Sequence, residues 1–221
     1  MVEGSSGSMC RCSVGDEEYV KRELVSCVRT LFSKGYVSSG GGNHSVRLRD
    51  GIWITPSGYP RSHLTVDDLV LIDSRGCVLR GDLRPSIEVP FHTEIYRVRC
   101  DINAVSHAHS PYSHALIQTL ELAEVDGHGG VFRLDDRVEQ MLPLRIPDTL
   151  NLLILEYRQL GSRALARLVG EAFSMHANMV VLLDHGVIGV GKCIHEAMLY
   201  VQLLEEWARC VTVSLRMDIS R

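Results

Sequence analysis

The segment from His44 to Ile54 restricts the possible folds of this chain more than any other part of the sequence. It reads HSVRLRDGIWI, so alternating residues lead to an Asp50-Gly51 pair and a short apolar run follows. An Asp-Gly pair between two such runs predicts a β-hairpin, because both residues accept the positive φ angles of a two-residue turn. A second pattern of this kind follows, with LVLID and CVLR on either side of Ser-Arg-Gly. We therefore expect antiparallel strands early in the chain.

Segments with helical periodicity alternate with these strands. In the first, Val20, Leu24 and Val28 recur at helical spacing after an acidic first turn, until Gly35 ends the pattern. Further helices are expected from near Ser86 to Arg99 and at 111–122, 160–175 and 192–217, and further strands at 102–109, at 141–146 and on both sides of His185-Gly186. This mixture favours a central, largely antiparallel sheet with helices packed on it.

The composition limits the class of protein. A chain of 221 residues that is 45% hydrophobic can bury one substantial core. We expect a flexible, Gly/Ser-rich segment at 1–15 and a single domain at 16–221. The net charge of -4 provides no basic field for binding nucleic acid or a membrane surface. No apolar run approaches the roughly 20 residues that span a bilayer, and no signal peptide is visible, so we expect a cytoplasmic protein.

The seven cysteines are scattered along the chain without a CxxC pair, and we expect mostly buried thiols. Only Cys10 and Cys12 lie close together. No further zinc ligands are near them in the sequence, so disorder of this segment is the favoured interpretation.

Three histidines and one glutamate are the candidates for chemistry. In VSHAHS, His107 and His109 lie on one face of an expected strand, as ligands of one metal ion or as surface polar residues. His185 follows the apolar run VVLLD, where it is either a third ligand or a turn histidine. Glu88 starts an expected helix, as a proton-transfer group or as an ordinary first-turn glutamate. Three imidazoles with one open position would form a Lewis-acid site.

Two loops contain groups suited to bind an oxyanion. GGGNHS and TPSG offer backbone N–H groups, the amide of Asn43 and the hydroxyl of Ser57, and Ser86 adds a hydroxyl at a helix N-terminus. Gly, Ser, Asn and Pro also form turns that bind nothing, so each loop alone is compatible with a structural role.

Taken in order, four blocks of the sequence resemble one family. GGNHSVRLRDGIWITPSG, RPSIEVPFHTEIYR, NAVSHAHS and VVLLDHGVIGVG are similar to the successive motifs of the class II aldolase/adducin family, over residues 17–212. The resemblance implies an α/β architecture of the α+β type, a three-layer fold whose central, mainly antiparallel, nine-stranded sheet is flanked by helices. It also implies a homotetramer with active sites at the subunit interfaces.

The resemblance further implies a role for each candidate residue. His107, His109 and His185 would bind a divalent ion, usually Zn2+, with Mn2+ or Co2+ as substitutes, and Glu88 would be the catalytic acid/base. The substrate phosphate would be held by Gly42, Asn43, Ser57, Gly58 and Ser86.

The implied reaction is the retro-aldol cleavage of a small phosphorylated ketose, such as fuculose 1-phosphate, through a zinc-stabilised enediolate whose carbon exchanges a proton with Glu88. A sugar-phosphate 4-epimerase and a metal-dependent decarboxylase are alternatives on the same site. A non-catalytic, adducin-like interaction module is disfavoured, because such relatives lack the metal ligands and this chain has all three histidines and Glu88.

One block departs from the family pattern. The aldolases resemble P-S-S-E, whereas this chain reads Pro85-Ser86-Ile87-Glu88, so Ile87 removes a hydroxyl that would contact phosphate. Either the substrate carries no phosphate or another group compensates, and Arg61 and Arg84 lie close in sequence to the loops.

The roles of several other polar side chains are open. The tyrosine that donates a proton to the aldehyde product is not assigned among Tyr59, Tyr112 and Tyr157. His44 and His92 are interpreted as structural histidines or as supports of the site, and His128 as a loop histidine or as a group that approaches a neighbouring site.

Overall fold

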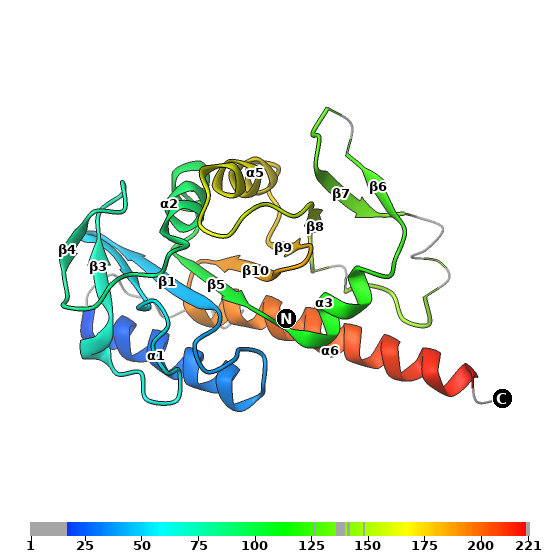
Figure 1. The fold of residues 1–221 in the computed structure, drawn as a ribbon, viewed down its shortest axis with the longest axis horizontal. Helices are drawn as coiled ribbons and strands as arrows, with labels where there is room; N and C mark the ends of the chain where they lie inside the picture. Colours follow the sequence, from blue (N-terminus) through cyan, green and yellow to red (C-terminus); the bar gives the residue numbers. More distant parts are fainter. Residues whose placement is uncertain (1–16, 126, 136–139, 141, 148, 220–221) are drawn as a thin grey trace, which may run out of the picture.

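A ten-stranded sheet crosses the middle of the molecule (Figure 1). The computed structural model describes residues 17–125, 127–135, 140, 142–147 and 149–219. The strand order is β4-β3-β2-β1-β5-β10-β9-β8-β7-β6. The strands are β1 (Asn43–Leu48), β2 (Gly51–Ile54), β3 (Val70–Ile72), β4 (Val78–Arg80), β5 (Ala104–Ala108), β6 (Leu122–Glu124), β7 (Val131–Leu134), β8 (Leu152–Leu155), β9 (Met179–Leu182) and β10 (Gly186–Gly191).

Helices cover both faces of this sheet, so the molecule has three layers (Figure 1). Helices α2 (Val89–Val98) and α5 (Arg163–Ser174) pack together on one face. On the other face lie α1 (Glu17–Ser33) and α6 (Ile194–Ile219), with α3 (Pro111–Ile117) against α6. A short 3-10 helix, η1 (Val66–Asp68), precedes β3. The predicted three-layer fold is confirmed.

The number of strands needs one correction, because the sheet has ten strands where the sequence predicts nine. The predicted mainly antiparallel pairing is confirmed, since every neighbouring pair is antiparallel except β8 with β9, which run parallel. The first predicted hairpin corresponds to β1 and β2, in which Leu48 faces Gly51 across the turn. The second corresponds to β3 and β4.

Strand β5 lies at the centre of the sheet between β1 and β10, and it is buried on both faces. Its Val105 packs in the core between the sheet and α2 and α5, whereas Ala104 and Ala108 pack toward α1 and α6. Because strand side chains alternate, His107 points to the same face as Val105. That face is the one covered by α2, which begins directly after Glu88.

The pairing register of β5 also places Asn43 beside His107. Asn43 of β1 and Ile188 of β10 are the two residues directly opposite His107. Side chains directly opposite each other on paired antiparallel strands share a face. Asn43, His107 and the start of α2 therefore meet on one side of the sheet.

The predicted helix boundaries need two corrections. The helix expected from Ser86 begins at Val89, because the Ser86 hydroxyl accepts the backbone N–H of Glu88 at 3.2 Å and holds this segment in a turn. The helix expected at 111–122 ends at Ile117. The chain then turns at 118–120, and Leu122 begins β6.

The strand expected at 141–146 is wrong for its described part, because residues 142–146 form bends and irregular chain. Met141 and the segment 1–15 lie outside the described residues. Strands β6, β7 and β8 lie between residues 122 and 155, where the only strand expected from the sequence is the one at 141–146. Two of them carry no alternating pattern that would reveal them, since β6 is Leu-Ala-Glu and β8 is Leu-Leu-Ile-Leu.

The expectation of mostly buried thiols is also wrong for the described cysteines. Cys27 and Cys193 are buried, but Cys77, Cys100 and Cys210 are exposed. In the described part of the chain, no helix combines the length and the apolar character that crossing a membrane would require.

Candidate metal centre and active site

Three imidazole rings meet at the end of β5. The Nε2 atom of His107 lies 3.2 Å from Nε2 of His109 and 3.2 Å from Nε2 of His185. One ligand nitrogen from each ring lies within 4.8 Å of the other two. Nitrogens so close together can bind one ion jointly, so the structure brings together the three histidines that the sequence singles out as metal ligands.

A hydrogen bond to the backbone sets the tautomer of His107. Its Nδ1 donates to the carbonyl oxygen of Val187 at 2.9 Å, so Nδ1 carries a proton and Nε2 is the nitrogen that faces the other two rings. Metal-binding histidines are commonly oriented by such a bond to a carbonyl, which fixes the ring and leaves the other nitrogen for the ion. His107 is fully buried, so this ring has no freedom to turn away.

Glu88 faces the three rings from the N-terminus of α2. Its Oε2 lies 3.2 Å from Nε2 of His107, and its Oε1 lies 3.3 Å from Nε2 of His185. Burial raises the pKa of this carboxyl group, but the neighbouring imidazoles and a hydrogen bond from Asn43 lower the pKa by more, so it lies below its ordinary value. Glu88 is therefore a carboxylate at neutral pH, beside the three imidazole rings.

Burial keeps the other two rings neutral. Burial, reinforced by His107, lowers the pKa of His109 to about 4 and the pKa of His185 to about 3. Neutral imidazoles are the form that binds a metal ion, so little proton release is needed at pH 7.

The donor set fits a divalent cation. Lone pairs of imidazole nitrogens and a carboxylate point at one volume, and Glu88 Oε1 has no hydrogen-bond partner among the described residues. Such a cluster of acceptors is satisfied by a cation. His109 is partly exposed, so the cluster is open to solvent on the side of His109, as in catalytic rather than structural sites.

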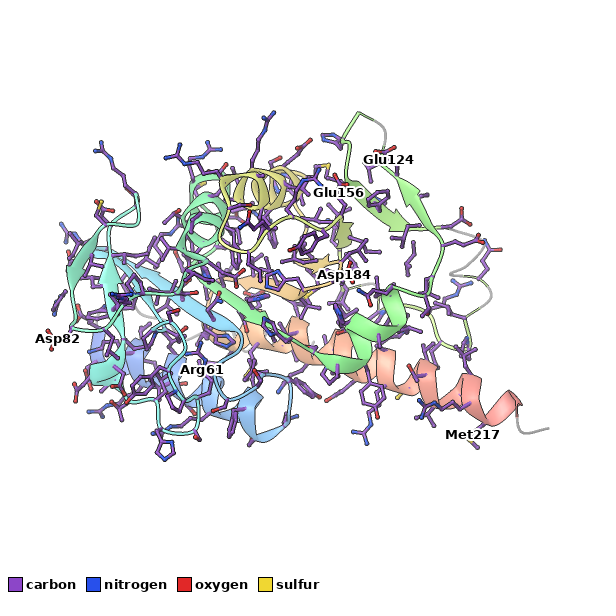
Figure 2. The ribbon with its side chains drawn as sticks, in the orientation of Figure 1. Arg61, Asp82, Glu124, Glu156, Asp184 and Met217 are labelled. Carbon is purple, nitrogen blue, oxygen red and sulfur yellow. The ribbon has the colours of Figure 1, made fainter. Side chains whose placement is uncertain are left out.

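Two residues shape the turn that carries His185. Asp184, which is labelled in Figure 2, has a φ of 55°, a left-handed conformation that Asp and Asn adopt more readily than most residues. Its carboxylate accepts a hydrogen bond of 2.5 Å from Gln118. A Cβ on Gly186 would lie 2.4 Å from the carbonyl oxygen of Ala108 and 3.2 Å from Cε1 of His107. Because Gly186 has no side chain, the turn can bring His185 against the end of β5.

The loops predicted to bind an oxyanion lie beside the histidines. A Cβ on Gly41 would lie 3.1 Å from Nδ1 of His109. Gly42 has a φ of 65°, and a Cβ there would lie 2.6 Å from the carbonyl oxygen of His107. The backbone N–H of Ser86 donates to the carbonyl oxygen of Thr55 at 3.2 Å, which joins the loop around Ser57 to the start of α2.

Arg61, which is labelled in Figure 2, connects these loops by hydrogen bonds. Its buried guanidinium donates to the carbonyl oxygens of Gly40, Gly41, Gly42 and Pro56 at 2.5 to 3.5 Å. Burial lowers its pKa to about 10, so it stays charged at neutral pH. Among the residues that the structure describes, no carboxylate pairs with Arg61, so no neighbouring side chain neutralises its charge. The sequence gives no signal of this burial.

Some predicted residues are engaged elsewhere. The Asn43 amide donates to Glu88 Oε2 at 2.7 Å, so one of its two N–H groups is used. The Ser57 backbone N–H donates to the carbonyl of Arg84 at 2.9 Å, and the Arg84 side chain is exposed. His128 pairs with Glu171 at 2.7 Å, and His44 pairs with Ser106 at 3.0 Å.

None of the three candidate tyrosines has a recorded contact with Glu88 or the histidines within the described chain. Tyr59 bonds Asp68, the Tyr112 ring lies under Arg209, and Tyr157 is half exposed. His92, by contrast, bonds Asn43 at 2.6 Å and thus connects to Glu88.

Comparisons with known proteins agree with this geometry. The profile of the Class II Aldolase and Adducin N-terminal domain matches residues 22–212. An L-fuculose phosphate aldolase from Methanocaldococcus jannaschii is 31% identical over 88% of this chain and 97% of that protein. A 3-oxo-tetronate 4-phosphate decarboxylase from Haemophilus influenzae is 30% identical over 86% of this chain and 85% of that protein.

A solved structure shares the whole architecture. The crystal structure of an L-fuculose-1-phosphate aldolase from Thermus thermophilus is similar with a TM-score of 0.71, at 26% identity, over 91% of this chain and 97% of that chain.

Proposed function

Because the chain belongs to the class II aldolase and adducin family, we propose that it is a metal-dependent aldolase that cleaves a small phosphorylated ketose such as fuculose 1-phosphate. The observation that carries the proposal is the convergence of His107, His109 and His185 on one volume that Glu88 also faces. A non-catalytic member of the family would have no use for this buried and mutually oriented set.

The three imidazole nitrogens are the proposed ligands of a divalent ion. Imidazole suits Zn2+, with Mn2+ and Co2+ as substitutes. The chemistry that such an ion supplies is Lewis acidity, which offsets negative charge on the substrate oxygens as a carbon–carbon bond breaks.

Glu88 is the proposed acid/base. It is a buried carboxylate with one oxygen that has no hydrogen-bond partner within the described chain, so it can accept a proton from the substrate carbon, or return one to it after cleavage. Its place at the N-terminus of α2 favours the charged form that accepts the proton.

The substrate phosphate is proposed to lie at the loops tied by Arg61. Backbone N–H groups at Gly42 and Gly58, the remaining amide hydrogen of Asn43 and the hydroxyls of Ser57 and Ser86 are the proposed contacts. The charge of Arg61 behind the loops supports binding of an anion and would compensate for the hydroxyl that Ile87 lacks.

A decarboxylase is the second candidate for the reaction. The observation in its favour is the 3-oxo-tetronate 4-phosphate decarboxylase with 30% identity over most of both chains. In that reaction the same residues would bind a phosphorylated keto acid, and Glu88 would deliver a proton after the loss of carbon dioxide. Both reactions belong to carbon–carbon lyases and need the same metal ligands.

We also propose that the protein is a homotetramer with active sites at subunit interfaces. Exposed apolar side chains beside the site support a contact there: Ile87, next to Glu88, is 63% exposed, and Leu160 is 45% exposed. The loop carrying Leu160 passes close to Ile87, since a Cβ on Gly161 would lie 2.8 Å from the Ile87 carbonyl oxygen. Light scattering in solution measures the mass; a monomer would contradict the proposal.

Metal content and product analysis test the proposed function. The purified protein is expected to hold about one equivalent of a divalent ion per chain after dialysis against a weak chelator, as an open three-histidine site would. His109→Ala is expected to lose both the ion and the activity, whereas His63→Ala, at an exposed histidine paired with Ser62, should keep both.

Product analysis then separates the two reactions. Fuculose 1-phosphate should be cleaved to an aldehyde and a ketone phosphate, while release of carbon dioxide from a phosphorylated keto acid alone would identify the decarboxylase. A wild-type protein that binds no ion even after zinc is added back would refute both.

A further inference from the structure

A line of buried polar side chains leads from Glu88 into the layer between the sheet and α2. Asn43, His92, Ser45 and Tyr96 follow one another in it, each within 2.6 to 2.8 Å of the next. All four are at most 5% exposed, so each donor and acceptor must find its partner inside the protein. This requirement allows the direction of every hydrogen bond to be derived.

The direction is set at the Glu88 end. A carboxylate only accepts hydrogen bonds, so the group of Asn43 that lies 2.7 Å from Glu88 Oε2 is the amide Nδ2, as a donor. The Asn43 carbonyl oxygen therefore points the other way, toward Nε2 of His92 at 2.6 Å. Because that oxygen can only accept, Nε2 of His92 must carry the ring proton.

His92 can satisfy this demand in only one neutral tautomer. Burial lowers the pKa of His92 to about 3, so the ring has one proton at neutral pH, and that proton is on Nε2. Its Nδ1 is then an acceptor and takes the hydroxyl hydrogen of Ser45 at 2.8 Å. Tyr96 in turn donates to Ser45, whose Oγ lies 2.8 Å and whose carbonyl oxygen lies 3.1 Å from the phenol.

All donors in the line therefore point toward Glu88, and the two oxygens of its carboxylate become different. Oε2 is held by Asn43, whereas Oε1 has no hydrogen-bond partner among the described residues and lies 3.3 Å from Nε2 of His185. An oxygen without a partner on the side of the metal ligands is the one free to exchange a proton with a substrate.

We propose that His92 is a positioning residue for catalysis: by donating to Asn43, it fixes the amide that anchors Glu88 Oε2 and so aims Oε1 at the substrate carbon. The inference rests on the proposed aldolase function. Without the proton on His92 Nε2, the Asn43 amide could turn over and present its carbonyl oxygen to the carboxylate, which would repel it.

A matched pair of substitutions isolates this role. In His92→Gln the amide nitrogen can take the place of Nε2 and donate to Asn43. In His92→Asn the shorter side chain places its amide group near the position of Nδ1, where its oxygen can accept from Ser45 but its nitrogen does not reach Asn43. Both variants are polar and similar in size, and they differ in which bond of His92 they keep: Gln keeps the bond to Asn43, and Asn keeps the bond to Ser45.

The readout is proton exchange at a carbon acid, because Glu88 is the proposed base of that step and no carbon–carbon bond has to break. Dihydroxyacetone phosphate in deuterium oxide is the probe, and proton NMR follows the exchange. In each cycle Glu88 Oε1 takes a proton from the hydroxymethyl carbon, the electron pair of the broken C–H bond stays on the substrate, and a deuteron from solvent returns to that carbon. Metal content and thermal unfolding are measured on the same samples.

For His92→Asn we expect kcat of exchange to fall on the order of 10- to 100-fold, as for other residues that orient a group at a metal site, with KM and metal content close to wild type. His92→Gln should recover most of the loss. His44→Asn is the control, because His44 is equally buried but bonds Ser106 and not Asn43; its kcat should follow the wild type.

Two results would overturn the inference in different ways. If the wild type with its full metal content exchanges deuterium and His92→Asn exchanges equally fast, the positioning role is wrong while the proposed function stands. If the wild type itself exchanges none, the proposed aldolase function fails and the inference fails with it.

Discussion

At the scale of single residues, burial determines what the site can do. His107 is fully buried at the end of a central strand, and a backbone carbonyl takes the proton of its Nδ1. Glu88 is 3% exposed, and the hydrogen bond that Asn43 donates to it favours the carboxylate. A surface glutamate or histidine would be free to rotate and to exchange partners with water. The buried ones have a single arrangement, and this arrangement makes the cluster a metal centre candidate.

Arg61 provides a test at this scale. The guanidinium group of Arg61 donates to four carbonyl oxygens, whereas the ammonium group of lysine has a single donor atom. Arg61→Lys therefore keeps a charge but releases the loops. We expect inhibition by inorganic phosphate to weaken on the order of tenfold or more, because bonds involving a charged group contribute about 1.5 to 3 kcal/mol.

Arg84→Lys is the comparison, since Arg84 is exposed and close to the same loops. Competition assays at several phosphate concentrations give the inhibition constants. Equal constants for the wild type and Arg61→Lys would show that the hydrogen bonds by which Arg61 holds the loops do not contribute to anion binding.

At the scale of elements, the site depends on short segments held by distant ones. Helix α3 follows His109 directly, but a helix of seven residues is not stable alone. Glu205 of α6, only 2% exposed, accepts the backbone N–H groups of Tyr112 and Ser113 at 2.9 and 2.8 Å. A buried carboxylate thus satisfies two free donors in the first turn of α3.

The corresponding prediction concerns the charge of Glu205. Glu205→Gln keeps the shape but loses the charge and turns one acceptor into a donor that faces an N–H group. We expect the free energy of unfolding to fall by about 2 kcal/mol, the range for a lost bond to a charged group. Glu206→Gln, at the neighbouring and mostly exposed position, should change it by less than about 0.5 kcal/mol. Urea unfolding measures both, and an equal effect of the two would disprove the capping role.

At the scale of the whole molecule, three layers bury histidines that would be protonated in the unfolded chain at mildly acidic pH. Burial lowers the pKa of His92 to about 3 and also lowers that of His44 well below its ordinary value of 6.5. Between pH 6.5 and about 3 the unfolded chain therefore binds protons at His92 that the folded chain does not. Acid shifts the equilibrium toward the unfolded state.

We therefore expect the free energy of unfolding to decrease as the pH falls below about 6.5, by about 1.4 kcal/mol per pH unit for each such histidine. The pKa of Glu88 is also lowered in the folded protein, so Glu88 further decreases the free energy of unfolding once the pH falls below the ordinary glutamate pKa. Urea titrations between about pH 7.5 and about pH 5, which span the ordinary histidine pKa, measure the slope. In His92→Phe the slope should be smaller, and a stability that is constant over this range would contradict the expectation.

The sequence alone indicates the local elements and the identity of the reacting groups. An Asp50-Gly51 turn, alternating strands and helical spacing depend on neighbours along the chain, so β1, β2, α1 and α6 are predictable. His107 and His109 lie on one strand, and their common face follows from its periodicity. The resemblance of the four blocks to one family adds Glu88 and His185 and the three-layer fold.

Only the tertiary structure decided how these groups are connected. Glu88 meets Asn43, which is 45 residues away in the chain, and His92 meets Ser45, which is 47 residues away. The burial of Arg61 and the pairing of the short strands β6 to β8 also depend on contacts between distant segments. Hydrogen-bond direction, burial and charge are properties of a three-dimensional neighbourhood, and no local pattern in the sequence encodes that neighbourhood.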